Sequence, residues 1–288
     1  MIRYTHFLLF FLLFSVHTAG ATLSGDAFIE LCRQGSASEL RAALEAGANA
    51  NERDGYGRTP LMTAAADNED PEAIMVLLDT GADVNAKNEY GETALIWAAG
   101  ENPNPQVVEI LLTAGADVEA RNTVGGSALM AAAENASHPR VIELLVEAGA
   151  DPDEQNGYDE TPLMWAAARN ENHEIVEALL AKGARVDARN KVGGTALLWA
   201  AAGNPNPKVI SALLRAGAEL EAKDKRGVTP LMAAAEDTPN PAVVLLLLEH
   251  GADPRTRDAR GKRALEHAED NEKLKGTAAL EALRQASR

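Results

Sequence analysis

Few side chains in this 288-residue sequence are placed to do chemistry. His138 and His173 lie at neighbouring positions in two successive copies of a segment that recurs along the chain, and two imidazoles brought together could bind a metal ion. No third ligand recurs near them, and the sequence shows no nucleophile elbow, phosphate-binding loop, zinc-ligand spacing or paired-cysteine motif. We therefore expect no catalytic residue, no metal ion and no cofactor. A metal-dependent enzyme that uses His138 and His173 is the alternative.

Tyrosine and arginine recur at one position of the repeated segment, where they suit binding better than catalysis. This position lies three residues before a threonine (a serine in one copy) that opens the signature of each copy. The candidate binding residues there are Tyr56, Tyr90, Tyr158 and Arg226. Tyrosine and arginine are frequent anchors of protein interfaces, although a tyrosine in such a place can also pack on its own neighbour.

Tryptophan recurs at a second position, four residues after the threonine. The candidates are Trp97, Trp165 and Trp199. A tryptophan there either lines a binding surface or packs between helices. Charged residues follow a few positions later, mostly acidic ones such as Asp67 and Glu101, and we interpret them as a solvated face.

Two sequence markers repeat with a step of 34 residues, as from Thr59 to Thr93. The first marker is Thr-Pro-Leu-Met or a close variant, and it begins at Thr59, Thr93, Ser127, Thr161, Thr195 and Thr229. The second marker, Gly-Ala, keeps the same step from Gly47 to Gly251. A fixed step of this length indicates a solenoid. We expect repeats that begin near residues 25, 59, 93, 127, 161, 195, 229 and 263, with six full repeats between two terminal capping repeats.

Each copy carries the signals for two helices. Small and apolar residues follow Thr59, which predicts a short helix that its neighbours can approach closely. The second helix is introduced by pairs such as Asn104-Pro105, an N-cap followed by a proline at the first helical position. It ends at the recurring glycine, and a turn rich in Asp, Asn and Gly follows. In the first copy, Ser36 and Glu39 have the spacing of a capping box.

These markers resemble the ankyrin repeat. The matching segments include Gly-x-Thr-Pro-Leu-x-x-Ala-Ala over 57–65 and Gly-Ala-Asp-Val-Asn over 81–85, and the resemblance covers nearly all of 22–288. It implies an all-α solenoid of stacked helix-loop-helix units with hairpin-like turns, in which turn tips and inner helices form a concave surface. It also implies a protein that binds another protein and is not an enzyme. We expect a monomer.

Two positions depart from the family pattern. The family usually has histidine three residues after the threonine, where this chain has Met62 or another apolar residue, so we expect apolar packing there. The bend between the two helices is one residue longer, as in Asn-Pro-Asn-Pro over 102–105, which predicts a stiffer and better capped bend.

The charge of the chain restricts its partners. A formal net charge of −16 repels phosphate backbones and anionic membranes, so we expect no nucleic acid and no membrane contact beyond the N-terminal segment. The charge favours solubility, or it attracts a cationic partner.

The single cysteine, Cys32, cannot form a disulfide within the chain, and we expect it to be a small buried side chain.

Residues 1–21 have the pattern of a secretory signal peptide. Arg3 precedes an apolar run over 7–16, and the small residues Ala19-Gly20-Ala21 follow. The run is shorter than the ~20 residues that a spanning helix requires. We therefore expect a periplasmic or secreted interaction scaffold. The alternative is a membrane-tethered scaffold that keeps an uncleaved N-terminal anchor.

Overall fold

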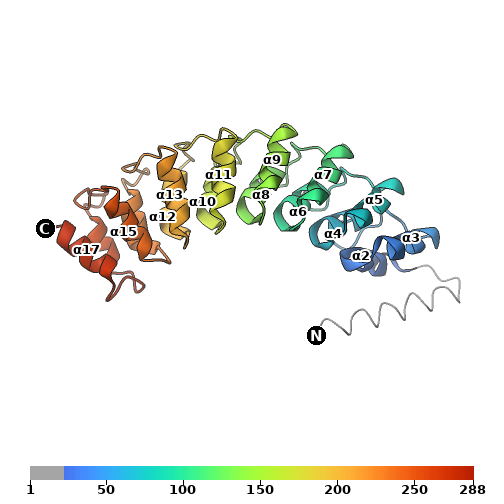
Figure 1. Cartoon of the computed structure of the whole chain (residues 1–288), viewed down its shortest axis with the longest axis horizontal. Helices are drawn as coiled ribbons and strands as arrows, with labels where there is room; N and C mark the ends of the chain where they lie inside the picture. Colours follow the sequence, from blue (N-terminus) through green and yellow to red (C-terminus); the bar gives the residue numbers. More distant parts are fainter. Residues whose placement is uncertain (1–22) are drawn as a thin grey trace. The chain divides into compact units, whose positions relative to one another are not determined.

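The computed structural model describes residues 23–288, and these form sixteen α-helices and no strand (Figure 1). The expected signal peptide, residues 1–21, lies outside the described residues. Within the described part, no helix has the length and apolar character needed to cross a membrane. The chain divides into two compact units, Met1–Ala128 and Leu129–Arg288. The predicted all-α fold of stacked helix pairs is confirmed.

The first unit contains three helix pairs, each an inner helix followed by an outer one. They are α2 (Gly25–Gln34) with α3 (Ala37–Glu45), α4 (Pro60–Asp67) with α5 (Pro71–Asp79), and α6 (Ala94–Glu101) with α7 (Pro105–Thr113). Inner helices pack on inner helices, α2 on α4 and α4 on α6, and outer helices pack on outer helices, α3 on α5 and α5 on α7. This is the arrangement expected of a solenoid, in which each pair contacts its neighbours.

The second unit contains five helix pairs in the same order. They are α8 (Ala128–Asn135) with α9 (Arg140–Glu147), α10 (Pro162–Arg169) with α11 (His173–Ala181), α12 (Ala196–Gly203) with α13 (Pro207–Arg215), α14 (Pro230–Asp237) with α15 (Ala242–Glu249), and α16 (Ala264–Ala268) with α17 (Ala278–Ala286). The inner helices from α10 to α16 pack in sequence, and so do the outer helices from α9 to α17.

Most outer helices begin where the capping residues predict, whereas α9 and α15 begin one residue later, after Pro139 and Pro241. The Ser36 hydroxyl and the Glu39 carboxylate form the expected capping box of α3. The Asn104 side chain accepts a hydrogen bond from the N–H of Gln106 at 3.0 Å, which caps α7. Asp70, Asn172 and Asn206 cap their helices in the same way. Each cap supplies an acceptor to an N–H group that has no partner inside the helix.

Buried asparagines at the ends of four inner helices connect these helices to the preceding repeat. The Asn102 amide donates to the carbonyls of Ala65 and Asn68, both at 2.9 Å. The Asn170 amide donates to two carbonyls of its preceding repeat, at 3.2 and 3.1 Å. Asn68 and Asn204 form the same pair of bonds. Sequence analysis did not identify this role, which falls nine residues after the threonine.

Apolar packing holds the repeats together at the position where the family usually has histidine, as predicted. The residues there are Met62, Ile96, Met130, Met164, Leu198 and Met232, and all are buried.

Cys32 is also buried, as expected, and burial raises the pKa of its thiol. The thiol therefore behaves as a small core side chain.

His267 of the last repeat lies between two carboxylates of the preceding repeat. Its Nε2 lies 3.1 Å from Asp258 Oδ2, and its Nδ1 lies 3.3 Å from Glu236 Oε2. Burial acts to raise the pKa of Asp258, but the N–H groups of Lys262 and Arg260 and the imidazole of His267 outweigh it, so the pKa is lowered. The fold thus keeps a charged carboxylate buried against its C-terminal repeat.

Replacing Asn170 by alanine should lower the free energy of unfolding of the second unit by about 2–4 kcal/mol, since each backbone group left without a partner costs ~1–3 kcal/mol. The carbonyls of Ala133 and Ala136 and the N–H of Asn172 all bond to this side chain. Urea unfolding followed by circular dichroism measures the change. The control is Asn135→Ala at an exposed position, which should have little effect. Equal losses in both variants would show that the buried amides carry no special stability.

The stability contributed by Asp258 should depend on pH. Because its pKa is lowered in the folded state, the contribution is complete above the ordinary carboxyl range of ~4 and is lost as the pH falls through the folded value. The protection of the Lys262 amide against hydrogen exchange, measured relative to its intrinsic exchange rate at each pH, should therefore fall on acidification, because this amide donates to Asp258. In an Asp258→Asn variant, protection should already be low at neutral pH and should show no further loss in acid. Glu269→Gln, an exposed control, should behave like the parent protein. An unchanged loss of protection in acid in the Asp258 variant would refute this assignment.

Candidate functional site

Backbone hydrogen bonds join the turn tips from one repeat to the next. In the first unit, the carbonyl of Tyr56 accepts from the N–H of Glu89 at 3.1 Å, and the carbonyl of Tyr90 accepts from Thr123 at 2.8 Å. In the second unit, the same bond links Tyr158 to Lys191, Val192 to Lys225 and Arg226 to Ala259. The backbone at this position is therefore part of the framework.

The side chains of the turn-tip tyrosines are largely exposed. Tyr56, Tyr90 and Tyr158 are 56%, 53% and 65% exposed. Val192, at the same position, is also exposed. Large exposed side chains on a fixed backbone lose little conformational freedom when they enter an interface.

Arg226 lies at a turn tip of the second unit and is exposed. Its Nε donates to Asp224 Oδ2 at 3.0 Å. Hydrogen bonding to Asp224 raises the pKa of the Arg226 guanidinium. The side chain is thus a permanent cation held at one edge of the turn.

The three tryptophans are half-buried on the inner helices, and two of them, Trp97 and Trp199, also line cavities. Trp97 lies on α6, Trp165 on α10 and Trp199 on α12. The rings of Trp165 and Trp199 are 6.4 Å apart and tilted by 60°. The guanidinium of Arg169 lies 4.8 Å above the ring of Trp165. Packing and surface roles are therefore combined at this position.

A groove of about 480 Å³ lies in the second unit and contains two of the predicted binding residues, Trp199 and Arg226. Its other lining residues are Ala168, Arg169, Val192, Gly194, Leu198, Ala202, Gly203, Asp224, Val228, Ala233, Glu236 and Asp237. A Cβ atom added to Gly194 would lie 2.8 Å from Nε1 of Trp199, so the indole occupies the space left by the missing side chain. The groove combines an aromatic wall, small residues and a charged rim.

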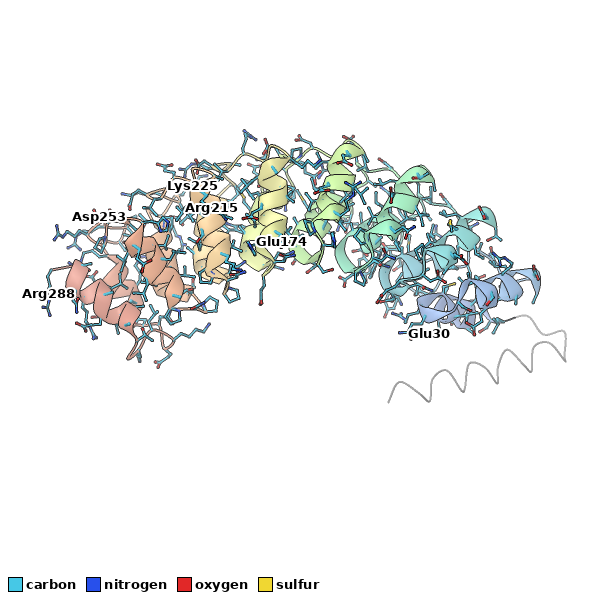
Figure 2. All side chains as sticks on the ribbon, viewed as in Figure 1. Glu30, Glu174, Arg215, Lys225, Asp253 and Arg288 are labelled. Atoms are coloured by element: carbon cyan, nitrogen blue, oxygen red, sulfur yellow. The ribbon has the colours of Figure 1, made fainter. Side chains whose placement is uncertain are left out.

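Most arginines of the second unit are paired with carboxylates. The pairs include Arg169 with Glu134, Arg185 with Asp153, Arg189 with Glu219, Arg215 with Glu177, Arg226 with Asp224, Arg140 with Glu143, Arg263 with Glu266 and Arg284 with Glu281. Figure 2 labels Arg215, whose guanidinium lies 2.7 Å from Glu177. Because acidic residues outnumber basic ones in the chain, carboxylates remain in excess after this pairing. The surface offers more to a cationic partner than to an anionic one.

The two histidines considered as metal ligands have different roles. His138 Nδ1 accepts a hydrogen bond from the N–H of Arg140 at 3.0 Å. The imidazole thus accepts the backbone hydrogen bond that an asparagine side chain accepts at this position in other repeats, such as Asn104. His173 is the first residue of α11. Among residues 23–288, no three His, Cys, Asp or Glu side chains gather in a group that could hold a metal ion.

Sequence analysis missed the groove because it considered the large side chains and not the small ones. At the position of Gly194, three other repeats have the larger residues Arg58, Glu92 and Glu160, whereas a fourth has Gly126. At the position of Gly203, they include Glu101. The loss of bulk at both positions beside a tryptophan is visible in the aligned repeats and could have indicated a hollow.

Comparison with known families agrees with the geometry of the stack. A family model described as ankyrin repeats (3 copies) matches residues 28–122 and 129–224, and a second, ankyrin repeats (many copies), matches residues 213–268. A search of curated proteins found no match. Ankyrin repeats generally mediate protein–protein interaction, and proteins built from them are typically non-catalytic. The chain belongs to the ankyrin-repeat family.

Proposed function

We propose that this protein is a non-catalytic scaffold, exported from the cytoplasm, that binds another protein through its turn tips and inner helices. The observation that carries the proposal is that exposed tyrosines occupy turn tips in each unit, on a backbone fixed by hydrogen bonds between repeats. Tyrosine supplies contact area with few rotatable bonds, which suits an interface anchor. The groove beside Trp199 in the second unit gives the same partner an apolar hollow to fill.

Export is supported by the composition of residues 1–21. A basic residue, a short apolar run and a small-residue site follow one another there, as in secretory signal peptides. We propose a periplasmic or secreted location. The competing arrangement is a scaffold tethered by an uncleaved N-terminal anchor.

The N-terminus of the protein recovered from cells distinguishes these two arrangements. We expect a chain that begins near Thr22 in the soluble envelope or culture fraction, because a signal peptidase cleaves after small residues such as Ala21. N-terminal sequencing or mass spectrometry of the purified chain gives the result. A chain that still begins at Met1 and sediments with membranes would favour the tethered scaffold instead.

Affinity capture from an envelope extract tests the binding surface. The bait is the exported chain with a C-terminal tag, compared with a variant in which Tyr56, Tyr90 and Tyr158 are all alanine. We expect a protein partner that is recovered at least about tenfold less by the variant, since each interface anchor contributes ~1–2 kcal/mol or more. Bound proteins are identified by mass spectrometry.

The control variant is Met75→Ala, which removes an exposed large side chain on the outer helix α5. It should capture the partner as well as the parent protein does. Both variants should keep the parent's circular dichroism and melting temperature. A partner retained in full by the tyrosine variant would exclude the turn tips, and failure to capture any protein would count against the scaffold.

A further inference from the structure

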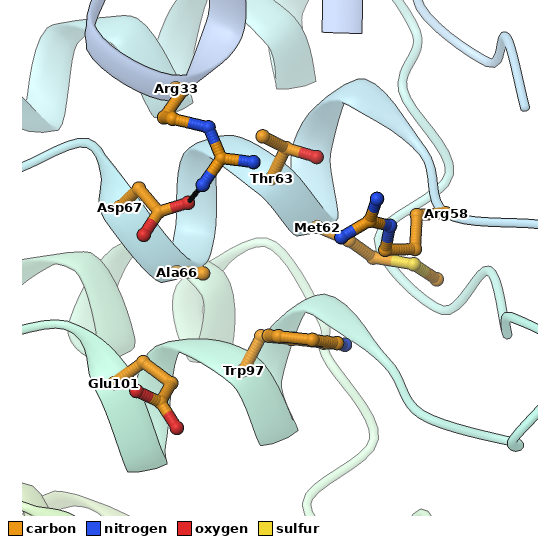
Figure 3. A pocket seen from close by; sticks show the side chains of 8 residues that line it. All are labelled: Arg33, Arg58, Met62, Thr63, Ala66, Asp67, Trp97 and Glu101. Carbon is orange, nitrogen blue, oxygen red and sulfur yellow. Dashed lines mark hydrogen bonds and ion pairs between the residues drawn. The ribbon is translucent and has the colours of Figure 1, made fainter. Parts of the chain in front are cut away.

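A small pocket in the first unit has a volume of about 120 Å³ and lies among the inner helices α2, α4 and α6 (Figure 3). It is lined by Arg33, Arg58, Met62, Thr63, Ala66, Asp67, Trp97 and Glu101. Figure 3 shows Trp97 and Glu101 on one helix, facing Thr63, Ala66 and Asp67 on the next. The pocket therefore combines an aromatic ring with two carboxylates.

Two polar atoms of this pocket have no hydrogen-bond partner in the described part of the chain. They are the hydroxyl of Thr63, a side chain that is only 5% exposed, and Nε1 of Trp97. Buried polar groups in proteins are almost always paired, so each exception asks for an explanation. A ligand that brings both donors and acceptors into the pocket would supply the missing partners.

The cations of the pocket are already paired. Arg33 pairs with Asp67 and Glu30, and Arg58 Nε donates to Asp54 Oδ2 at 2.7 Å. Within residues 23–288, the carboxylate of Glu101 forms no hydrogen bond or ion pair. The unmatched charge that the pocket offers to a ligand is therefore negative.

The second unit shows a related arrangement, in which a cation lies over the tryptophan. On α10, Arg169 follows Trp165 by four residues, lies 4.8 Å above its ring and pairs with Glu134 of the preceding repeat. On α6, Glu101 follows Trp97 by four residues and occupies the position of Arg169. The described part of the first unit thus has a tryptophan and carboxylates, but no arginine of its own lies over the Trp97 ring. Glu101 occupies the position from which Arg169 reaches the Trp165 ring in the second unit.

We propose that this pocket receives an arginine side chain of the partner protein, an inference that rests on the proposed scaffold function. The planar guanidinium stacks on Trp97, pairs with Glu101 and donates a hydrogen bond to the Thr63 hydroxyl. Guanidinium groups combine aromatic stacking with forked hydrogen bonding, which an ammonium group cannot do. A main-chain carbonyl beside that arginine accepts from the Trp97 indole N–H.

The test uses the full exported chain and a small probe, N-acetyl-arginine amide. The chain has three tryptophans, so its indole N–H groups give three NMR signals that single Trp→Phe variants assign. We expect the Trp97 signal to move saturably with a dissociation constant of about 1–10 mM, the range open to one side chain. N-acetyl-lysine amide should bind more weakly, and neutral N-acetyl-glutamine amide should produce no saturable shift.

Three variants sharpen the test. Glu101→Gln should weaken the probe about tenfold, because a charge-assisted pair becomes a neutral one. Glu109→Gln, on the outer helix of the same repeat, should leave binding unchanged. Arg169→Ala should empty the corresponding place above Trp165 and make the Trp165 signal respond to the probe.

The outcomes separate this inference from the proposed function. A silent Trp97 signal, an equal response to the glutamine probe, or full binding by Glu101→Gln overturns the arginine site, even if affinity capture finds a partner. A saturable, Glu101-dependent shift supports the site, even if affinity capture finds none, in which case only the scaffold proposal fails. Tighter binding of free arginine than of the amide probe would point to the amino acid as ligand and overturn a protein side chain as the occupant.

Discussion

The carboxamide of asparagine bonds to backbone groups of two repeats at once, and the rest of each stack depends on it. In Asn102, the amide nitrogen binds two carbonyls of the preceding repeat while the oxygen accepts from Asn104 at 2.9 Å. Asn104, two residues later in the same bend, has a similar role. Its amide donates to the backbone carbonyl of Glu69, and its side-chain oxygen caps α7. Each side chain therefore sets both the shape of its own bend and the distance to its neighbour. The helices, and with them the turn tips, follow from that spacing.

Local sequence predicted the elements because local chemistry determines them. Threonine, asparagine and proline mark helix starts in any context, and the apolar residues nearby predicted which helix faces are buried. The buried amides of Asn102 and Asn170 were not foreseen, because their partners lie in another repeat and only the tertiary structure brings them together. For the same reason, a histidine such as His267 gave no sign that Asp258 and Glu236 would enclose it.

The candidate surface was predictable in part. The tyrosines are exposed because they lie in a turn, so their position in the repeat was enough to predict that they are accessible. The tryptophans were ambiguous, because the same inner-helix position touches both the neighbouring helix and a cavity. What decides between these roles is the residue across from each ring, which is Gly194 for Trp199 and, on the same helix, Arg169 for Trp165. Such pairings between elements are not contained in any single stretch of sequence.

The hydrogen bonds between turn tips have a consequence for how such a protein can diversify. Because they use only backbone atoms, tyrosine, valine and arginine occupy the same tip position on the same scaffold, as in Tyr158, Val192 and Arg226. A substitution at a tip position changes the exposed side chain without touching the backbone bonds that hold the tip in place. Selection on the exposed surface and selection for a folded chain can then act on separate sets of positions. A lineage carrying this architecture can vary the surface of its turn tips while the bonds between the tips stay unchanged.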